Sequence, residues 1–477
     1  MKVYNTLTGQ KEEFTPPQDG TIRMYVCGIT PYAPSHIGHA RPAVFWDVVR
    51  RFLEYRGYRV FAVQNFTDID DKIIAAAQQE GVHPLELAAR YSDQYLEEVR
   101  RLGVKPMDAY PKASEHIGEI IALIQGLIDK GYAYQSDGDV YFSVTSFEEY
   151  GKLSHRTLEE MKAGARVEVS DKKRHPMDFA LWKAAKPGEP KWSSPWGEGR
   201  PGWHIECSAM SIKYLGPSFD FHGGGSELVF PHHENEIAQS EAFTGVKPFV
   251  RYWVHNELVN IHGEKMSKSL GNIITIREML DKYHPCAIRL FLLSAHYRTP
   301  LNFSEEAMEA AVKGYERMQA ALDNLWSISR SAQPASGETL PQLEDAFSRA
   351  KQQFEASMED DFNTAGAIAA LFDLTRTVNA CQDWLGAHPA EATLYLDSFM
   401  KLVSVLGIAE DPRHRQATPS ETRIVEELLS LLIEVRQRAR EKKDWPTADY
   451  IRDRLGELGI QLEDGPTGTR WKKVRGT

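Results

Sequence analysis

The pattern of apolar and polar positions predicts a β-α-β unit near the N-terminus. Residues 22–27 form a short apolar run that is typical of a buried strand, and a polar loop follows them. Apolar residues then recur at helical spacing up to Gly57, which is placed to end the helix. Residues 58–65, YRVFAVQN, have the composition of a second strand. The unit predicts an α/β fold with a doubly wound parallel sheet of Rossmann type. The helical positions are Phe45, Val48, Val49, Phe52 and Leu53.

Changes in this pattern divide the chain into three predicted domains. Residues 1–315 form the α/β domain, with an insertion over about 101–200 that ends in a stretch rich in Pro, Gly and Trp. The linker-like segment RSAQPASGETLP is followed by amphipathic helices, which predict a helical bundle over 316–410. A second break, AEDPRHRQATPSE, precedes a small C-terminal domain predicted over 420–477.

Composition then limits the class of protein. The hydrophobic fraction of 42% and the charged fraction of 26% are those of a soluble globular protein. Four cysteines in 477 residues do not make a disulfide framework, which indicates a reducing compartment. The polar N-terminus does not resemble a signal peptide, and no run reaches the roughly 18 apolar residues that span a bilayer. We therefore expect a cytoplasmic protein that does not associate with a membrane. The net charge of −11 leaves room for nucleic acid only at a local basic surface.

Two histidines mark the start of the first helix. In PYAPSHIGHARP, His36 and His39 lie where the loop after the first strand becomes the helix, and Pro42 suits the first turn. A helix N-terminus at this place is an anion site, and two imidazoles can donate there to a phosphate. Gly38 lets the backbone approach a flat ligand. A pair of capping histidines is the alternative.

A lysine-rich loop follows much later in the chain. In HGEKMSKSLGN, Lys265 and Lys268 bracket a short segment between Gly263 and Gly271. Lysine is a compact cation on a flexible stem, so such a loop suits a polyphosphate and can close over it during a reaction. A solvated basic turn is the alternative for a generic K-x-x-K.

The segment FPHHENE gathers four groups that are able to bind a metal. His232 and Glu236 share a face if the segment is helical, although His233 and Glu234 compete for the same assignment. A closed zinc site needs about four ligands, often with thiolates among them. Cys27 ends the first predicted strand, where doubly wound folds place ligands, and Cys207 lies next to polar residues after a loop. Cys286 and Cys381 have the pattern of buried helix residues. Spacing alone does not decide the set.

The strings HIGH and KMSKS together resemble the class I aminoacyl-tRNA synthetases. Further motifs resemble the cysteinyl-tRNA synthetase family in particular and extend from Met24 to Ser304. The resemblance implies that ATP, with Mg²⁺, contacts Gly38, His36, His39 and Lys268, and that Lys265 and Lys268 act on the departing pyrophosphate. The motifs are MYVCGITPYAPSHIGHAR, NFTDIDDKII, GRPGWHIECSAM, HGGGSELVFPHHENEIAQSEA, KMSKSLGN and HYRTPLNFS.

The same resemblance implies a cysteine pocket with one zinc ion per chain. The matching ligand positions are Cys27, Cys207, His232 and Glu236, and His204 stays outside the set. Zinc favours sulfur over oxygen, so the thiol of cysteine is selected against the hydroxyl of serine without an editing domain. Two further positions that the resemblance implies line the pocket, Trp203 and Thr67. Glu227 stands where the family pattern has Asp, so its role is open.

The end of the chain resembles the tRNA-binding parts of that family. The helices after the linker resemble the anticodon-binding bundle of class I synthetases, and residues 434–473 resemble the C-terminal module of bacterial members. A dense basic stretch, with Trp445 and Trp471 placed to stack on bases, favours RNA contact. The basic residues are Arg436, Arg438, Arg440, Lys442 and Lys443.

We therefore expect activation of L-cysteine with ATP and its transfer to the 3′ end of tRNA(Cys), by a protein that is expected to be a monomer. One alternative is a ligase that uses the same adenylation chemistry to join cysteine to an amino sugar. Its C-terminal region would differ from residues 436–473. A second alternative is a non-catalytic zinc-dependent RNA-binding protein, which predicts decay of HIGH or KMSKS, whereas both are intact here.

Overall fold

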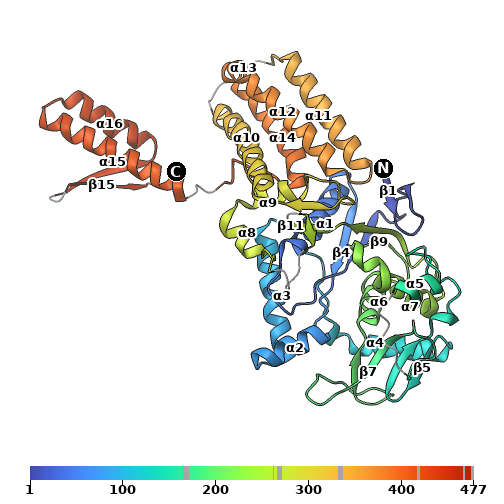
Figure 1. Cartoon of the computed structure of the whole chain (residues 1–477). Coiled ribbons are helices and arrows are strands. Elements are labelled where there is room, and N and C mark those ends of the chain that lie inside the picture. Colours follow the sequence, from blue (N-terminus) through green and yellow to red (C-terminus); the bar gives the residue numbers. More distant parts are fainter. Residues whose placement is uncertain are drawn as a thin grey trace. The chain divides into compact units, whose positions relative to one another are not determined.

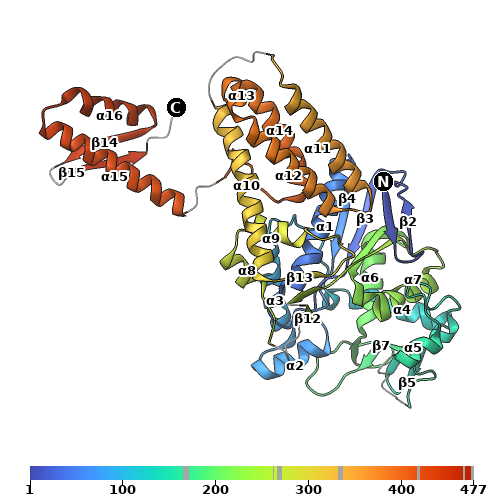
Figure 2. The same ribbon diagram turned by 45° about the horizontal axis from the view of Figure 1, so that its top comes forward.

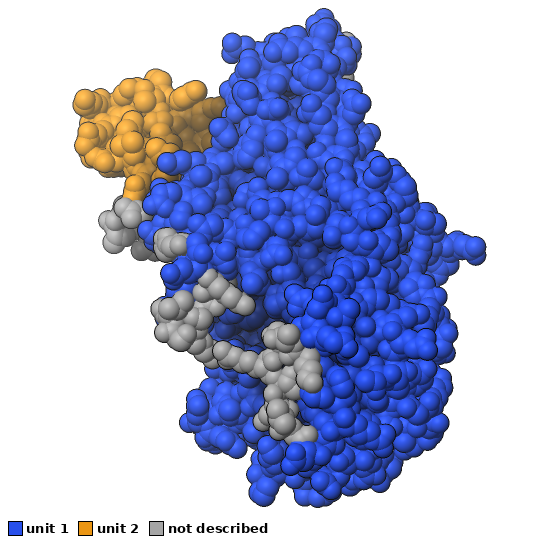
Figure 3. Space-filling view, turned by 45° about the vertical axis from the view of Figure 1, so that its right-hand side comes forward, with its two compact units in different colours: residues 1–412 blue, residues 413–477 orange. Residues whose placement is uncertain are grey.

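The computed structural model describes residues 1–164, 171–261, 263–265, 271–330, 337–415, 419–465 and 468–473. The chain forms two compact units, Met1–Pro412 and Arg413–Thr477, which are coloured separately in Figure 3. Lys268 and most of the linker-like segment before residue 337 lie outside the described residues.

A four-stranded parallel sheet lies at the centre of the first unit (Figure 1). Its strand order is β10-β9-β3-β4, and every neighbouring pair is parallel. The predicted β-α-β unit is confirmed, because β3 and β4 are joined through the long helix α1 (Ile37–Tyr55). The predicted α/β fold is confirmed with it. The strands are β3 (Thr21–Val26), β4 (Arg59–Gln64), β9 (Phe219–Gly225) and β10 (Val250–Asn256).

Alternate side chains of the sheet enter two different hydrophobic cores. On β3, Met24 and Val26 pack into the core that contains α1, whereas Tyr25 packs into a second core. That second core holds α4 (Ile117–Asp129), α6 (Trp203–Leu215) and α7 (Glu234–Thr244). The strands are therefore covered on both faces, as the apolar run in their sequence predicts.

The predicted insertion contributes a four-stranded antiparallel sheet of order β5-β6-β7-β8. It lies beside α4, α6 and α7 in Figures 1 and 2. Its strands are β5 (Ala133–Ser136), β6 (Asp139–Phe142), β7 (Phe179–Ala184) and β8 (Gly199–Pro201). Short helices of this part are η1 (Ala113–Glu115), η2 (Val144–Ser146) and α5 (Leu158–Gly164).

The first unit also contains two smaller sheets. The hairpin β1-β2 (Lys2–Asn5 and Gln10–Glu13) forms the first. The second has the order β12-β11-β13, with Glu264–Lys265, Val259–Ile261 and Leu301–Phe303. Other helices of this unit are α2 (Asp71–Glu80), α3 (Pro84–Arg101), η3 (Ser226–Leu228), η4 (Val229–His233), α8 (Ile276–Lys282) and α9 (Pro285–Leu292).

A helical bundle completes the first unit and shares the core that contains α1. Figure 2 shows its long helices side by side. The predicted domain boundary at residue 315 falls within α10, so the division there stays a prediction. The helices are α10 (Glu305–Ser329), α11 (Pro341–Glu359), α12 (Thr364–Ala380), α13 (Gln382–Ala387) and α14 (Pro389–Leu406).

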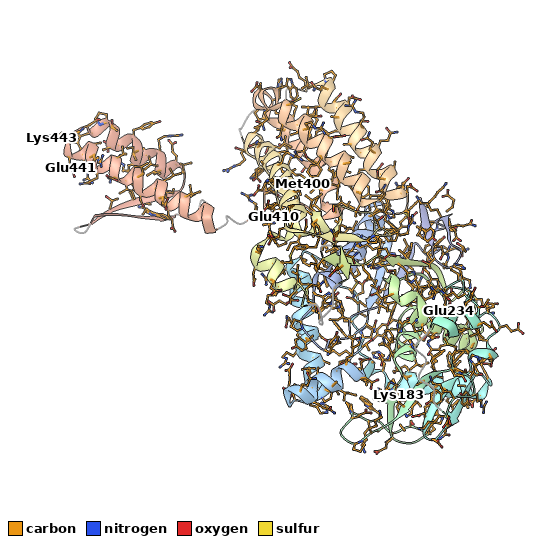
Figure 4. All side chains as sticks on the ribbon, viewed as in Figure 1. Lys183, Glu234, Met400, Glu410, Glu441 and Lys443 are labelled. Carbon is orange, nitrogen blue, oxygen red and sulfur yellow. The ribbon has the colours of Figure 1, made fainter. Side chains whose placement is uncertain are left out.

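The second unit is a helical hairpin followed by a β-hairpin. Helices α15 (Pro419–Glu441) and α16 (Trp445–Glu457) precede β14 (Ile460–Gly465) and β15 (Gly468–Lys473). Figure 4 labels Glu441 and Lys443 at the turn between the two helices. The side chain of Asp444 caps α16 by accepting from the Thr447 amide at 3.2 Å. Most of the predicted basic stretch lies on α15 and in this turn.

A buried ion pair joins α1 to α9, and its arginine also bonds to the bundle. The Asp47 carboxylate accepts from Arg289 at 2.6 Å, and Arg289 also donates to the carbonyl of Leu406 at the end of α14 at 2.7 Å. The side chains of Asp47 and Arg289 are 0% and 1% exposed. Burial acts to raise the pKa of Asp47, but the Arg289 and Arg51 guanidinium groups outweigh it and hold that pKa below its ordinary value.

We expect the substitution Asp47→Asn to lower the free energy of unfolding by about 3–5 kcal/mol at pH 7, since it leaves a buried guanidinium uncompensated. A carboxyl whose folded-state pKa is depressed stabilises above its unfolded pKa of about 3.9 and loses that contribution as pH falls. The difference between wild type and variant should therefore shrink below about pH 4. Urea unfolding at pH 7 and at lower pH measures it. Asp373→Asn, at an exposed ion pair on α12, is the control and should cost under about 1 kcal/mol.

Candidate active site

A cavity of about 300 Å³ opens at the carboxyl ends of β3, β4 and β9. From β3 the chain continues to β4 on one side of the sheet, and the later strand β9 lies on the other side of β3. The cavity therefore lies at the switch point in the strand order, where doubly wound folds bind ligands. Gly28 allows β3 and β4 to meet here, because a Cβ on it would lie 1.6 Å from the carbonyl oxygen of Asn65. Cys27, Gly38, His39, Thr67 and Trp203 line the cavity.

The two histidines of HIGH sit in the first turn of α1. His36 is the N-cap residue, and its amide donates to Nδ1 of His39 at 3.2 Å. The two rings are stacked with their centroids 3.8 Å apart. Burial, and then the neighbouring His36, lowers the pKa of His39 to about 3, so its ring is neutral and still able to donate one hydrogen bond. The prediction that Pro42 occupies the first turn is wrong, because α1 already begins at Ile37 and Pro42 falls inside it.

The predicted metal ligands come together from three parts of the chain. The ligand atoms of Cys27, Cys207, His232 and Glu236 all lie within 4.8 Å of one another. The two sulfur atoms are 3.9 Å apart, and the Cys27 sulfur is 3.7 Å from Oε1 of Glu236. A tetrahedral zinc site with bonds of about 2.0–2.3 Å has edges of roughly 3.3–3.8 Å, so these separations fit that geometry. The Nε2 atom of His232 lies 3.0 Å from Glu236 Oε1.

A second group of possible ligands overlaps the first. Cys27 and Glu236 belong to both groups, and His222 and His233 complete the second one. Nε2 of His233 is 3.2 Å from the Cys27 sulfur, and Nε2 of His222 is 2.9 Å from Oε2 of Glu236. The groups differ in access, because Cys207 and His232 line the cavity, whereas His222 and His233 are fully buried behind it.

The competing carboxylate, Glu234, is occupied elsewhere. It points from the start of α7 toward the insertion, where its carboxylate accepts from the amides of Gly151, Leu153 and Ser154 at 3.0, 3.1 and 2.8 Å (Figure 4). The Ser154 hydroxyl donates to it as well, at 2.9 Å. Neither possible metal group among the described residues includes Glu234. Its contacts make it an anchor for the insertion.

Histidines behind the cavity form a hydrogen-bonded chain that the sequence argument missed. Nδ1 of His233 lies 2.7 Å from Nε2 of His255, whose Nδ1 lies 2.8 Å from the Thr6 hydroxyl. Burial lowers the pKa of His255 to about 3 and the pKa of His233 well below its ordinary value, so both rings are neutral. The sequence did contain a signal for one further buried histidine, His222, because FHGGG places a histidine inside an apolar, glycine-rich strand.

Glu236 and His232 carry opposite charges within the cluster, because Glu236 and Cys207 raise the pKa of His232 to about 10 against the effect of burial. Burial acts to raise the pKa of this carboxyl, but His222 and His232 outweigh burial and hold it at about 2. The hydrogen bond from Cys27 lowers the pKa of Cys207 to about 6 against the effect of burial. A carboxylate and a thiolate are the states in which Glu236 and Cys207 bind a metal, whereas His232 has to lose its proton to bind one.

Trp203 and Thr67 both line the cavity. The Trp203 ring stacks on His232 with centroids 4.4 Å apart, and His204 contacts His232 through their Nδ1 atoms at 2.9 Å. Thr67 does not cap the following helix, because Asp70 caps α2. Glu227 also lines the cavity. Its carboxylate packs against Gly225, because a Cβ on Gly225 would lie only 2.3 Å from Oε2 of Glu227.

The lysine loop is described only at its edges. Lys265 ends strand β12, which pairs with β11 in an antiparallel hairpin. Residues 266–270, with Lys268, lie outside the described residues. Leu258, one residue before β11, lines the cavity, so the hairpin begins at the cavity wall.

Comparison with known proteins first identifies the class. Residues 13–313 match the family model described as the class I (C) tRNA synthetase catalytic domain. Among solved structures, the chain is similar to Mycobacterium tuberculosis methionyl-tRNA synthetase in complex with methionyl-adenylate, with a TM-score of 0.60 and 18% identity over 81% of this chain and 90% of that one. It is also similar to a putative arginyl-tRNA synthetase from Campylobacter jejuni, with a TM-score of 0.57 and 14% identity over 83% and 94% of the chains. The chain therefore has the catalytic domain of a class I aminoacyl-tRNA synthetase.

Closer relatives narrow the class to one family. The chain is 53% identical to the cysteine–tRNA ligase of Carboxydothermus hydrogenoformans over 99% of this chain and 100% of that protein. It is 54% identical to the cysteine–tRNA ligase of Pelotomaculum thermopropionicum over the same shares. Residues 353–410 match the DALR domain, and residues 428–471 match the cysteinyl-tRNA ligase anticodon binding domain. The chain belongs to the cysteinyl-tRNA synthetase family.

Proposed function

We propose that the chain activates L-cysteine with ATP to cysteinyl-adenylate and transfers the cysteine to the 3′ end of tRNA(Cys). The observation that carries this proposal is that Cys27, Cys207 and His232, grouped with Glu236, line a cavity that also reaches His39. Full-length identity of about half to cysteine–tRNA ligases supports it. The matched anticodon binding domain favours a tRNA acceptor over an amino sugar.

The cavity-facing group is the proposed zinc site. Cys27, Cys207, His232 and Glu236 provide two sulfurs, a nitrogen and an oxygen at separations that fit tetrahedral zinc. These residues would hold a zinc ion, which would supply a Lewis acid that favours a thiolate over a hydroxyl. His222 and His233, behind the cavity, then act as partners that orient Glu236 and Cys27.

The remaining groups position ATP and the amino acid. His36 and His39 donate to the phosphates of ATP, which binds with Mg²⁺, at the N-terminus of α1, and Gly38 leaves room for the nucleotide. Lys265 and Lys268 stabilise the charge on the departing pyrophosphate. Trp203, whose ring stacks on His232, closes the pocket over the side chain of cysteine, and Thr67 also lines this pocket.

The compartment and the oligomeric state of the protein are also part of this proposal. No helix among the described residues has the length and apolarity to cross a bilayer. We propose that the protein works in the cytoplasm as a monomer.

The test is ATP-dependent attachment of labelled cysteine to total tRNA by the purified, zinc-loaded protein, with serine in parallel. We expect charging with cysteine and none above background with serine, because a pocket that requires a coordinating sulfur rejects the hydroxyl analogue. Equal charging with serine would contradict the role of the metal. Cysteine-dependent ATP–pyrophosphate exchange without any charging of tRNA would redirect the proposal to a small-molecule acceptor.

A further inference from the structure

The junction between α11 and α12 is strained and buried, and the proposed chemistry does not use it. Asp361 and Phe362 both have a left-handed backbone, with φ of 63° and 51°, and both are 0% exposed. Non-glycine residues adopt this conformation at a cost of about 1–3 kcal/mol each, so surrounding contacts must hold them there. Those contacts lead toward the active site.

The Asp361 carboxylate binds two separate segments. Its Oδ1 accepts from the Tyr4 amide in β1 at 2.8 Å and from the Tyr297 hydroxyl at 2.7 Å. Its Oδ2 accepts from Nε of Arg298 at 2.8 Å. The main chain adds a bond from the Asp361 amide to the Lys2 carbonyl at 2.9 Å. Asp361 therefore fixes the turn at residues 296–299 to the bundle.

The other side of this turn is held by Arg41, which lies two residues after His39 on α1. The guanidinium donates to the carbonyls of His296 and Thr299 at 3.1 and 2.6 Å. It also donates to the carbonyls of Glu257 and Leu258 in the cavity wall at 2.8 and 3.0 Å. Arg41 is 2% exposed, so these four bonds are shielded from water.

The turn also leads directly into the strand that supports the lysine-loop hairpin. Strand β13 follows it and pairs in parallel with β11, register Val259 to Leu301. The side chain of Asn302 accepts from the Gly263 amide at 2.6 Å, between β11 and β12. The turn thus contacts the HIGH helix, the cavity wall and the strand beneath the hairpin that ends at Lys265.

We propose that Asp361 is a positioning residue for adenylate formation. Through Arg298 and Tyr297 it sets the 296–299 turn, which in turn places the N-terminal part of α1 and the β11–β12 hairpin on either side of ATP. The inference rests on the proposed function. Helices α6 and α7, which carry Cys207 and Glu236, pack in the other hydrophobic core. The 296–299 turn contacts the ATP side directly, so the network acts mainly on ATP.

The substitution Asp361→Asn tests this inference in the full-length protein, since asparagine tolerates the left-handed backbone and removes the second acceptor oxygen. In cysteine-dependent ATP–pyrophosphate exchange without tRNA, we expect kcat/KM for ATP to fall about 10-fold, with KM for ATP raised and KM for cysteine within about twofold of wild type. Asp360→Asn is the matched control. It removes an exposed partner of Lys11 one residue away and should leave all three constants unchanged.

A second variant, Arg298→Gln, removes the donor to Asp361 from the other side and should give the same split between the two substrates. The double variant should be no worse than the more impaired single one, because both changes release the same turn. Unchanged constants in Asp361→Asn would overturn the inference. So would a fall in kcat with both KM values at wild type, which marks a loss of folded protein only. Wild-type protein without cysteine-dependent exchange would contradict the proposed function instead.

Discussion

Replacing Cys207 with serine should remove the metal and the activity together. The serine hydroxyl does not provide the second sulfur ligand beside Cys27, whose sulfur lies 3.9 Å from that of Cys207. Serine nearly preserves the size of the buried side chain, so the fold should survive. We expect zinc content to fall well below one ion per chain and kcat/KM for cysteine in pyrophosphate exchange to fall by about 1,000-fold or more, since a metal contributes several kcal/mol.

Metal analysis and exchange kinetics on the same preparation measure this result. Cys381→Ser is the matched control, because Cys381 is also buried but lies at the end of α12, away from the cluster. A second pair of variants distinguishes the proposed metal ligand, Glu236, from the residue that anchors the insertion, Glu234. Glu236→Gln should lose zinc, whereas Glu234→Gln should retain zinc and lower stability by about 1–3 kcal/mol, because its partners are amides of the insertion. Full activity in zinc-free Cys207→Ser protein would refute the metal assignment.

Removal of residues 413–477 should separate the two half-reactions. The first unit contains the whole sheet, the cavity and the metal cluster. The second unit carries the basic residues of α15 and the match to an anticodon binding domain. We expect kcat/KM for tRNA in aminoacylation to fall at least about 100-fold, which is about 2.7 kcal/mol of lost binding. Pyrophosphate exchange should stay within about threefold of the full-length protein.

Salt dependence makes this test more specific. If the second unit neutralises phosphates, the affinity of the full chain for tRNA should fall steeply as salt rises, and the truncated chain should show a shallower slope. A full-length variant with Arg438→Glu and Lys442→Glu should reproduce part of the loss without removing the unit. Equal charging of tRNA by the truncated and the complete chain would show that residues 413–477 do not contribute to binding.

The local parts of the fold could be read from the sequence, because their signals are short-ranged. The apolar run before Cys27 predicted β3 within one residue of its observed ends, and the helical spacing from Phe45 to Leu53 falls inside α1. Pro42 misled because α1 begins one turn earlier than the proline suggests. The antiparallel sheet of the insertion was not predicted, because its strands have three to six residues and alternate only weakly.

The candidate site was predictable only in pieces. His232 and Glu236 were expected to share a face, and their side chains do meet, although His232 lies in η4 before α7 begins. Neither cysteine carries a local signal, since 180 positions separate them, and only family resemblance brought them into one set. Glu234 and Glu236 look alike in the sequence. Only the packing of the insertion against Glu234 separates their roles.

The same separation has a consequence for how the protein is made. Cys27 leaves the ribosome long before Cys207, His232 and Glu236 exist, and β3 has to wait equally long for its neighbour β9. At about 5–20 residues per second, 180 positions correspond to roughly 10–40 s of synthesis. During that interval the nascent chain holds an unmetallated thiol beside an unpaired strand edge. Capture of the proposed zinc has to wait until Glu236 has been made, and a shortage of zinc would leave the thiols of newly made chains exposed to oxidation.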